Sequence, residues 1–130
     1  MENLKYKVEN TGLSGDMGIE LIYAKDGQAK GRMKIEDKHM NVNGTIHGGS
    51  FFTLADMIAG CAVCSIWDKI ATVNSSIEFM RTSKKSEYIT CVANVGKNGK
   101  NLIWTTAKIY DDNNLLLCEY KALYYRLEKE

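Results

Sequence analysis

The chain has 130 residues, which fits one domain spanning residues 1–130. Its net charge is +1, so nothing in its charge favours binding to nucleic acid. Hydrophobic residues make up 45% and charged residues 25%, a balance typical of globular proteins rather than disordered ones. The first residues are too polar for a signal peptide, so we expect a cytoplasmic protein whose four cysteines are reduced.

The first half of the chain predicts a polar start followed by two strands. Residues 1–16 are polar with scattered apolar positions, and we expect a loop there with at most a short helix at the start. Lys25-Asp26-Gly27-Gln28 favours a tight turn, because Asp-Gly accepts the positive φ angles of hairpin turns. The alternating segments on either side of this turn predict strands, and the polar segment that follows predicts a loop: strands at 17–24 and 29–36, loop at 37–46.

Residues 50–67 predict a helix that is apolar on nearly all sides. From Gly48 to Trp67 the only charged side chain is Asp56. The stretch is about as long as a membrane span, but Thr53, Asp56 and Gly60 interrupt its middle, so we expect a buried core helix and no membrane contact. These three residues are spaced by three and four and therefore share one face of the helix.

The second half of the chain predicts four strands joined by turns or short loops. Consecutive strands with short links pair antiparallel, and Asn98-Gly99 is a strong hairpin signal. Strands with a segregated helix describe an α+β domain, in which we expect a sheet to wrap around the apolar helix. The four expected strands are residues 70–80, 88–95, 102–110 and 115–127.

Asp56 and the glycine pair before the helix are the main candidates for a site. A carboxylate in an apolar helix requires hydrogen bonds, an ion pair or a chemical role, so Asp56 is either a buried residue bonded to backbone amides or a general base or nucleophile. His47-Gly48-Gly49 is either a plain turn or a helix N-terminus whose free N–H groups form an oxyanion hole. Asn41, in the preceding loop, could offer its amide to a carbonyl group or a water molecule.

The histidines and cysteines do not predict a metal centre. His47 could act as a base or a capping group, and His39 is the only other histidine; no acidic residue accompanies them at zinc-like spacing. Cys61-Ala-Val-Cys64 has the spacing of a redox motif, but such motifs lie at a helix N-terminus and this pair lies near the helix end. We interpret all four cysteines as small core residues and expect no metal.

The sequence leaves two possible roles for each of two basic turns, residues 81–85 and residues 97–100. They either add solubility or contact the phosphates of a nucleotide-bearing substrate. The chain contains neither G-x-x-x-x-G-K-[ST] nor G-x-G-x-x-G, so we expect no bound ATP or dinucleotide cofactor. It also lacks the G-x-S-x-G of serine hydrolases.

The segment His39-Met-Asn41-Val-Asn-Gly-Thr-Ile-His47-Gly48-Gly49, followed by Thr53-Leu-Ala-Asp56, resembles the signature of hotdog-fold acyl-CoA thioesterases. The most similar type is the phenylacetic-acid-degradation (PaaI-like) group, with N-x(5)-H-G-G and an acid nine residues after the histidine. The order of strands and helix agrees over roughly residues 15–127. The resemblance implies a hotdog fold: a long central helix wrapped by a curved antiparallel sheet of about six strands.

The resemblance also implies roles for individual residues and an assembly. Asp56 would be the general base or nucleophile, and the Gly48 amide would polarise the thioester carbonyl. Asn41 and His47 would position substrate or water, and Thr72 would orient the attacking water. The implied assembly is a homodimer, often paired into a tetramer, with sites across the interface: Asp56 and Thr72 would face Asn41 and Gly48 of the other subunit. The segments implied to bind the substrate include these residues: Gly49, Phe79, Arg81, Thr82, Ser83, Lys84, Lys97, Asn98, Gly99, Lys100 and Asn101.

Two other functions fit the same fold class. A hotdog hydratase or dehydratase would use a histidine–acid pair on a different motif, which the sequence lacks. A non-catalytic acyl-CoA sensor would usually carry a DNA-binding domain, for which 130 residues leave no room. The sequence therefore favours an acyl-CoA thioesterase, without specifying its acyl group.

Overall fold

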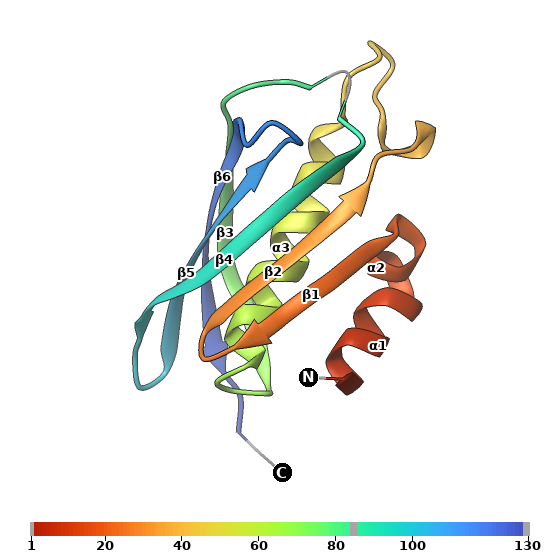
Figure 1. Ribbon diagram of the computed structural model, residues 1–130. Helices are drawn as coiled ribbons and strands as arrows, with labels where there is room; N and C mark the ends of the chain where they lie inside the picture. Colours follow the sequence, from red (N-terminus) through yellow and green to blue (C-terminus); the bar gives the residue numbers. More distant parts are fainter. Residues whose placement is uncertain (1, 84–85, 129–130) are drawn as a thin grey trace.

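The structure, a computed structural model, describes residues 2–83 and 86–128. One long helix, α3, lies against a six-stranded antiparallel sheet, and two short helices precede the first strand (Figure 1). In chain order the elements are α1 (Glu2–Asn10), α2 (Gly12–Met17), β1 (Ile19–Lys25), β2 (Gln28–Lys34), the 3₁₀ helix η1 (Asp37–His39), α3 (Gly48–Cys64), β3 (Ile70–Phe79), β4 (Tyr88–Asn98), β5 (Leu102–Tyr110) and β6 (Leu116–Arg126).

The strand order in the sheet is β1-β2-β4-β5-β6-β3. Strands joined by tight turns pair with each other, as the sequence predicts: β1 with β2, β4 with β5, and β5 with β6. The prediction is wrong for β3 and β4, which are consecutive but do not pair. Their longer link, residues 80–87, lets β3 pair with β6 at one edge while β4 pairs with β2 in the interior.

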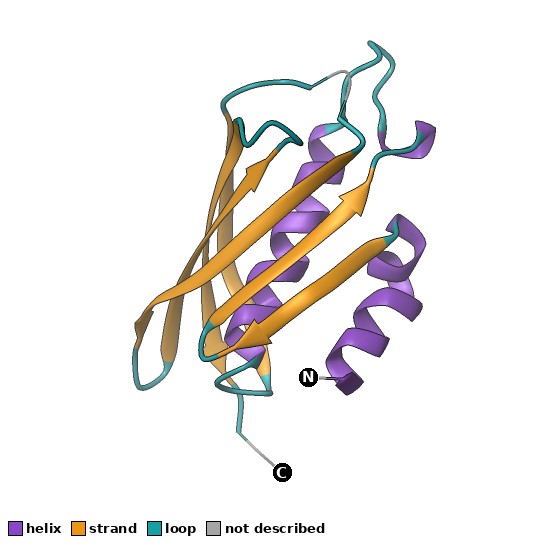
Figure 2. Ribbon diagram, in the orientation of Figure 1, coloured by secondary structure: helices purple, strands orange, loops and turns teal. Residues whose placement is uncertain are grey.

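Helix α3 packs on the concave side of the curved sheet (Figure 2). Its sheet-facing side is buried and includes Leu54, Ala55, Ile58 and Ala59, while Asp56 on another side is only half-buried. The sheet wraps around the buried side of the helix, as expected, and leaves one face of the helix less covered. The less buried positions recur every three or four residues, which is the period of one helix face: Phe52, Thr53, Asp56, Met57, Gly60 and Cys64.

Two predicted turns form, for different reasons. Asp26 and Gly27 have φ angles of 53° and 79°, the left-handed pair that a tight turn between β1 and β2 requires. Gly99, between β4 and β5, does not have a positive φ angle. A Cβ atom there would lie 2.6 Å from the Leu102 carbonyl oxygen, so close backbone approach requires this glycine.

The N-terminal segment contains more helix than the expected loop with a short helix at its start: it forms both α1 and α2. Only Val8 of α1 is buried, so the segment has a weak hydrophobic pattern from which to predict a helix. Side chains of α1 bond to edge strand β1: the Glu9 carboxylate accepts from the Leu21 N–H at 2.9 Å, and Lys5 donates to the Leu21 carbonyl at 3.0 Å. Lys5 and Glu9 also pair with each other one helical turn apart.

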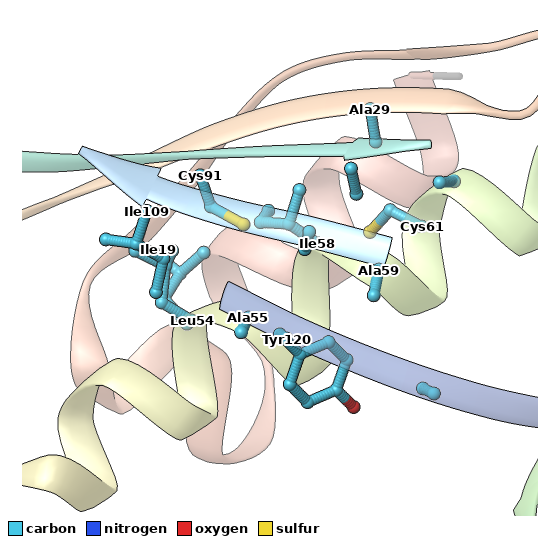
Figure 3. Close-up of a cluster of buried hydrophobic side chains, with 14 of the residues drawn as sticks. Ile19, Ala29, Leu54, Ala55, Ile58, Ala59, Cys61, Cys91, Ile109 and Tyr120 are labelled. Atoms are coloured by element: carbon cyan, nitrogen blue, oxygen red, sulfur yellow. The ribbon is translucent and has the colours of Figure 1, made fainter. Parts of the chain in front are cut away.

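The core lies between α3 and the sheet, and Figure 3 shows part of it. All four cysteines are free thiols; Cys61, Cys91 and Cys118 are buried and Cys64 is half-buried, which confirms their interpretation as small core residues. Burial raises the pKa of Cys61, and likewise that of Cys118, to about 12, so these thiols stay protonated near neutral pH. None of the helices in the described part of the chain has both the length and the apolar character to cross a membrane.

Candidate active site

Asp56 lies on the less buried face of α3, at the wall of a pocket of about 210 Å³. Thr72 lines the same pocket, so the structure brings together the carboxylate and the hydroxyl residue singled out from the sequence. A shift in register between Thr72 and Asn74 marks an irregularity in edge strand β3 at this point. The remaining lining is mostly apolar and comes from α1, α3, β3 and β6: Leu4, Met57, Gly60, Cys61, Cys64, Ile70 and Tyr124.

Tyr120 of β6 is a neighbour of Asp56 that the sequence analysis missed. Its hydroxyl donates to Asp56 Oδ1 at 3.1 Å. The alternation along β6 places Tyr120 and Tyr124 on the inner face of the sheet, and this pattern could have indicated buried tyrosines. The contact with Asp56 joins residues 64 positions apart, so no local pattern indicates it.

The N-terminus of α3 leaves one backbone donor unused. His47 is the N-cap residue, and its Nδ1 accepts from the Gly49 N–H at 2.7 Å. In residues 2–83 and 86–128, no acceptor bonds the Gly48 N–H. The Phe79 ring lies beside Gly48, where a Cβ atom on this residue would lie 3.2 Å from it. Because Gly48 has no side chain, its N–H can approach a bound carbonyl oxygen at the positive end of the helix dipole.

The observed role of His47 is to cap α3, which gives a testable difference from a catalytic role. We expect His47→Ala to lower the free energy of unfolding by about 1 kcal/mol, because it removes an N-cap acceptor. His47→Asn should restore most of this loss, since asparagine is a good N-cap residue. Urea denaturation of the three proteins measures the effect, and equal midpoints for His47→Ala and the unmodified protein would contradict the capping role.

Asn41 organises the loop in front of α3. Its Oδ1 accepts from the N–H groups of Asn43 and Thr45 at 2.9 and 3.1 Å, and its Nδ2 donates to the Thr45 hydroxyl at 2.8 Å. Asn41 also lines a second pocket, of about 270 Å³, near the N-terminus of α3. Three residues implied to bind substrate line this second pocket with it: Phe79, Arg81 and Thr82.

His39 has a structural role. It is fully buried, and its Nδ1 accepts from the Glu36 N–H at 2.9 Å. Its Nε2 lies 2.8 Å from the Met17 carbonyl oxygen, to which it donates. Both ring nitrogens are thus used, and the ring joins α2 to the loop that carries Asn41.

The described residues of the two basic turns lie at different ends of the sheet and do not meet in one chain. Phe79 of β3 pairs with Cys118 of β6, Cys118 pairs with Ile109 of β5, and Ile109 pairs with Cys91 of β4. Phe79 and Cys91 therefore lie at the same level of the sheet. Asn98 is about seven residues further along β4, or about 23 Å at the rise of a strand. Ser83 lies near the second pocket, where its carbonyl accepts from the Ile46 N–H at 3.2 Å, whereas Lys84 lies outside the described residues.

Much of the turn after β4 is held by Arg126. Its guanidinium donates to Asn98 Oδ1 and, at 3.1 Å, to the Gly99 carbonyl, and its N–H donates to the Asn101 carbonyl at 2.9 Å. Lys97 lies over the Trp104 ring at 5.3 Å. Three residues of this turn therefore have structural contacts that the sequence did not indicate: Asn98, Gly99 and Asn101. The side chains of Lys97 and Lys100 are exposed and place positive charge on the surface.

The site residues of one chain fall into two separate groups. Asp56 and Thr72 line the first pocket, and Asn41 lies by the second pocket near the Gly48 amide. Gly48 and Asp56 are eight positions apart on one helix, which is about 12 Å along its axis. A base and an oxyanion donor must both lie about 3 Å from the same reacting group, so Gly48 and Asp56 of one helix cannot serve the same carbonyl.

A sequence model of one protein family matches this chain. The model is described as Thioesterase superfamily, and it matches residues 43–118, more than half of the chain. The chain belongs to the thioesterase superfamily. The matched range of this superfamily member contains Gly48, Asp56 and Thr72, while Asn41 lies just before it.

Relatives agree with this assignment. Human acyl-coenzyme A thioesterase 13 is 34% identical over 93 residues, covering 70% of this chain and 66% of that relative, so the chain spans just under two thirds of its length. Acyl-coenzyme A thioesterase PaaI of Escherichia coli is 30% identical over 101 residues, covering 76% of this chain and 71% of PaaI. The resemblance to the PaaI-like group is thereby confirmed.

Solved structures confirm the hotdog fold. The structure of E. coli PaaI, from the phenylacetic acid degradation operon, has a TM-score of 0.90 at 23% identity, covering 98% of this chain and 92% of that chain. A hypothetical thioesterase of Streptococcus pneumoniae, solved with coenzyme A, has a TM-score of 0.86 at 22% identity, covering 100% of this chain and 98% of that chain. At these identities the structural likeness supports the fold alone.

Proposed function

We propose that this protein is an acyl-CoA thioesterase that hydrolyses an acyl-CoA to the free acid and CoA. The observation that carries the proposal is the half-buried Asp56 carboxylate, held at a pocket wall in a member of the thioesterase superfamily. The unbonded Gly48 N–H supplies the complementary electrophilic group. A carboxylate base and an oriented amide donor together can catalyse thioester hydrolysis.

In the proposed reaction, Asp56 takes a proton from a water molecule while the water oxygen bonds to the thioester carbon. The carbonyl oxygen becomes an oxyanion, which the Gly48 N–H stabilises. The C–S bond then breaks, and the sulfur leaves as CoA thiolate and receives the proton. Thr72, at the wall of the Asp56 pocket, orients the water. Direct attack by Asp56 would use the same groups and pass through a mixed anhydride that water then cleaves.

The catalytic unit that we propose is a homodimer. Gly48 and Asp56 of one helix are too far apart to act together, so each site needs Asp56 and Thr72 of one subunit and Asn41 and Gly48 of the other. Edge strand β3 supports this assembly, because it is exposed along much of its length and carries Val73 with 55% of its surface accessible. Such an edge offers unpaired backbone groups to another strand. A dimer of dimers would contain the same pair.

The CoA part of the substrate carries phosphates, and the surface cations are suited to bind them. Arg81 borders the Asn41 pocket, and Lys97 and Lys100 are exposed at the other end of the sheet. Guanidinium and ammonium groups form charge-assisted hydrogen bonds to phosphate. Because the two basic segments are far apart in one chain, we propose that they contact CoA from different subunits or at different sites.

The test of this function is release of CoA thiol from a panel of short, long and aromatic acyl-CoAs. We expect multiple turnovers with at least one of them, with the free acid and CoA formed in equal amounts. Acyl-CoA binding without turnover across the panel would instead support a sensor, and neither binding nor release would contradict the proposal.

A further inference from the structure

We infer that Tyr120 is a positioning residue that holds the Asp56 carboxylate in one orientation for catalysis. The inference rests on the proposed thioesterase function and extends it to a residue outside the family signature. Its basis is the hydrogen bond from the Tyr120 hydroxyl to Asp56 Oδ1, at 3.1 Å. Among the described residues, no other side chain donates a hydrogen bond to Asp56.

Packing fixes the place of the Tyr120 ring. The residue is 1% exposed and lies on interior strand β6, in register with Ile77 of β3 and Ala107 of β5. Its ring meets the Phe52 ring edge to face, with centroids 5.5 Å apart. Phe52 and Asp56 are one turn apart on α3, so a single contact between β6 and α3 aligns both the ring and the hydroxyl. Figure 3 shows the Tyr120 ring extending from β6, with its hydroxyl at the far end.

The hydroxyl acts only as a donor towards Asp56 at neutral pH. Burial raises the pKa of Tyr120 to about 12, and the nearby Asp56 carboxylate adds to the shift. The surrounding titratable groups also stay neutral, because burial raises the pKa of Tyr124 on β6 and of Cys64 on α3. Strand β3 contributes the uncharged Ser75 hydroxyl. The proton of the Tyr120–Asp56 contact therefore remains on the tyrosine.

This arrangement assigns different roles to the two carboxylate oxygens. Oδ1 is engaged by Tyr120, so its lone pairs are less available to remove a proton. Oδ2 has no donor among the described residues and is the oxygen that we assign to the attacking water. Without the Tyr120 hydroxyl, the Asp56 side chain could rotate, and both oxygens would spend time away from the reacting geometry.

The test compares Tyr120→Phe with a matched control, Tyr125→Phe, on the outer face of the same strand. We expect Tyr120→Phe to lower kcat by about 10- to 100-fold while KM changes by less than about two-fold, because orientation in the transition state is lost and not substrate binding. Tyr125→Phe should match the unmodified protein in both measurements.

Each outcome has a definite meaning. An unchanged kcat in a folded Tyr120→Phe protein would overturn the inference while leaving the thioesterase function intact. If that variant fails to fold, 2,3-difluorotyrosine at position 120 keeps the ring and provides a more acidic donor, so kcat should change while KM stays within about two-fold; an unchanged kcat would overturn the inference. If the unmodified protein cleaves no acyl-CoA, the proposed function fails. The ¹³C chemical shift of the Asp56 carboxyl at neutral pH then reports the contact directly, and the same chemical shift with and without the Tyr120 hydroxyl would contradict it.

Discussion

Replacing Asp56 with asparagine should lower kcat for a cleaved acyl-CoA by about 10³-fold or more, since removal of a general base or nucleophile commonly has effects of this size. The amide is nearly isosteric with the carboxylate and can still accept from the Tyr120 hydroxyl, so the fold should be preserved. It can neither take a proton from water nor attack the thioester. The measurement is steady-state release of CoA thiol, with circular dichroism and thermal melting as checks of folding.

Asp26→Asn is a suitable control for the same chemical change. Asp26 lies in the turn between β1 and β2, far along the chain from the site, and asparagine tolerates its positive φ angle. The control should keep the full activity and stability of the unmodified protein. If Asp56→Asn were equally active, another group would have to activate the water, and the proposed role of Asp56 would be rejected.

The second large effect concerns the assembly: two inactive variants should restore activity when they are mixed. Asp56→Asn removes the base. Gly48→Pro removes the Gly48 N–H, and proline is well tolerated at the first position of a helix. The extended backbone of His47 suits a residue before proline, and the neighbouring Phe79 ring, which is 54% exposed, has room to shift. Each variant alone should be almost inactive.

A mixed dimer of these variants contains one site with both groups intact. Its Asp56 comes from the Gly48→Pro chain and its Gly48 amide comes from the Asp56→Asn chain. After unfolding and refolding an equal mixture, about half of the dimers should be mixed, so about a quarter of the unmodified activity should return. The measurement is CoA release from the refolded mixture, compared with each variant refolded alone.

The controls distinguish activity restored by the formation of mixed dimers from activity restored by refolding itself. Mixing the two variants without unfolding should restore activity only as fast as subunits exchange, and refolding either variant alone should restore none. No recovery from a mixture shown to contain mixed dimers would mean that each chain builds its own site. The helix geometry would then have to change, because about 12 Å separates Gly48 from Asp56 along α3.

The sequence predicts those parts of the molecule that local patterns determine. The apolar run predicts α3, which begins two residues earlier than expected, at Gly48, because His47 caps it. Alternation predicts the first two strands, and runs rich in Val, Ile, Thr, Tyr and Trp predict the other four. The resemblance of the segment containing Asn41, His47 and Asp56 to a known signature predicts the family that the sequence comparisons confirm. These features share a cause, since each depends on residues within about 17 positions of one another in the sequence.

The features that the sequence does not predict depend on contacts between distant residues. Tyr120 meets Asp56 across 64 positions, and Arg126 reaches back to Asn98 across 28. Helix α1 buries little apolar surface and is instead tied to β1 by polar side chains. The placement of β3 beside β6 likewise follows from the whole sheet. Polar contacts of this kind leave no periodic signal in the chain.

The contact between α1 and β1 has a consequence for how large an assembly can grow. At the β1 edge, Glu9 and Lys5 already occupy the N–H and carbonyl of Leu21, so a further strand would have to displace a charged pair. At the β3 edge, no charged side chain of the described residues bonds to the backbone of the strand in this way. Two copies of such a sheet can pair through their β3 edges. Because the β1 edges of both copies are blocked by α1 side chains, no further copy can be added along the sheet. The short N-terminal helix, which contributes little to the core, thus favours a closed, finite particle over a fibre.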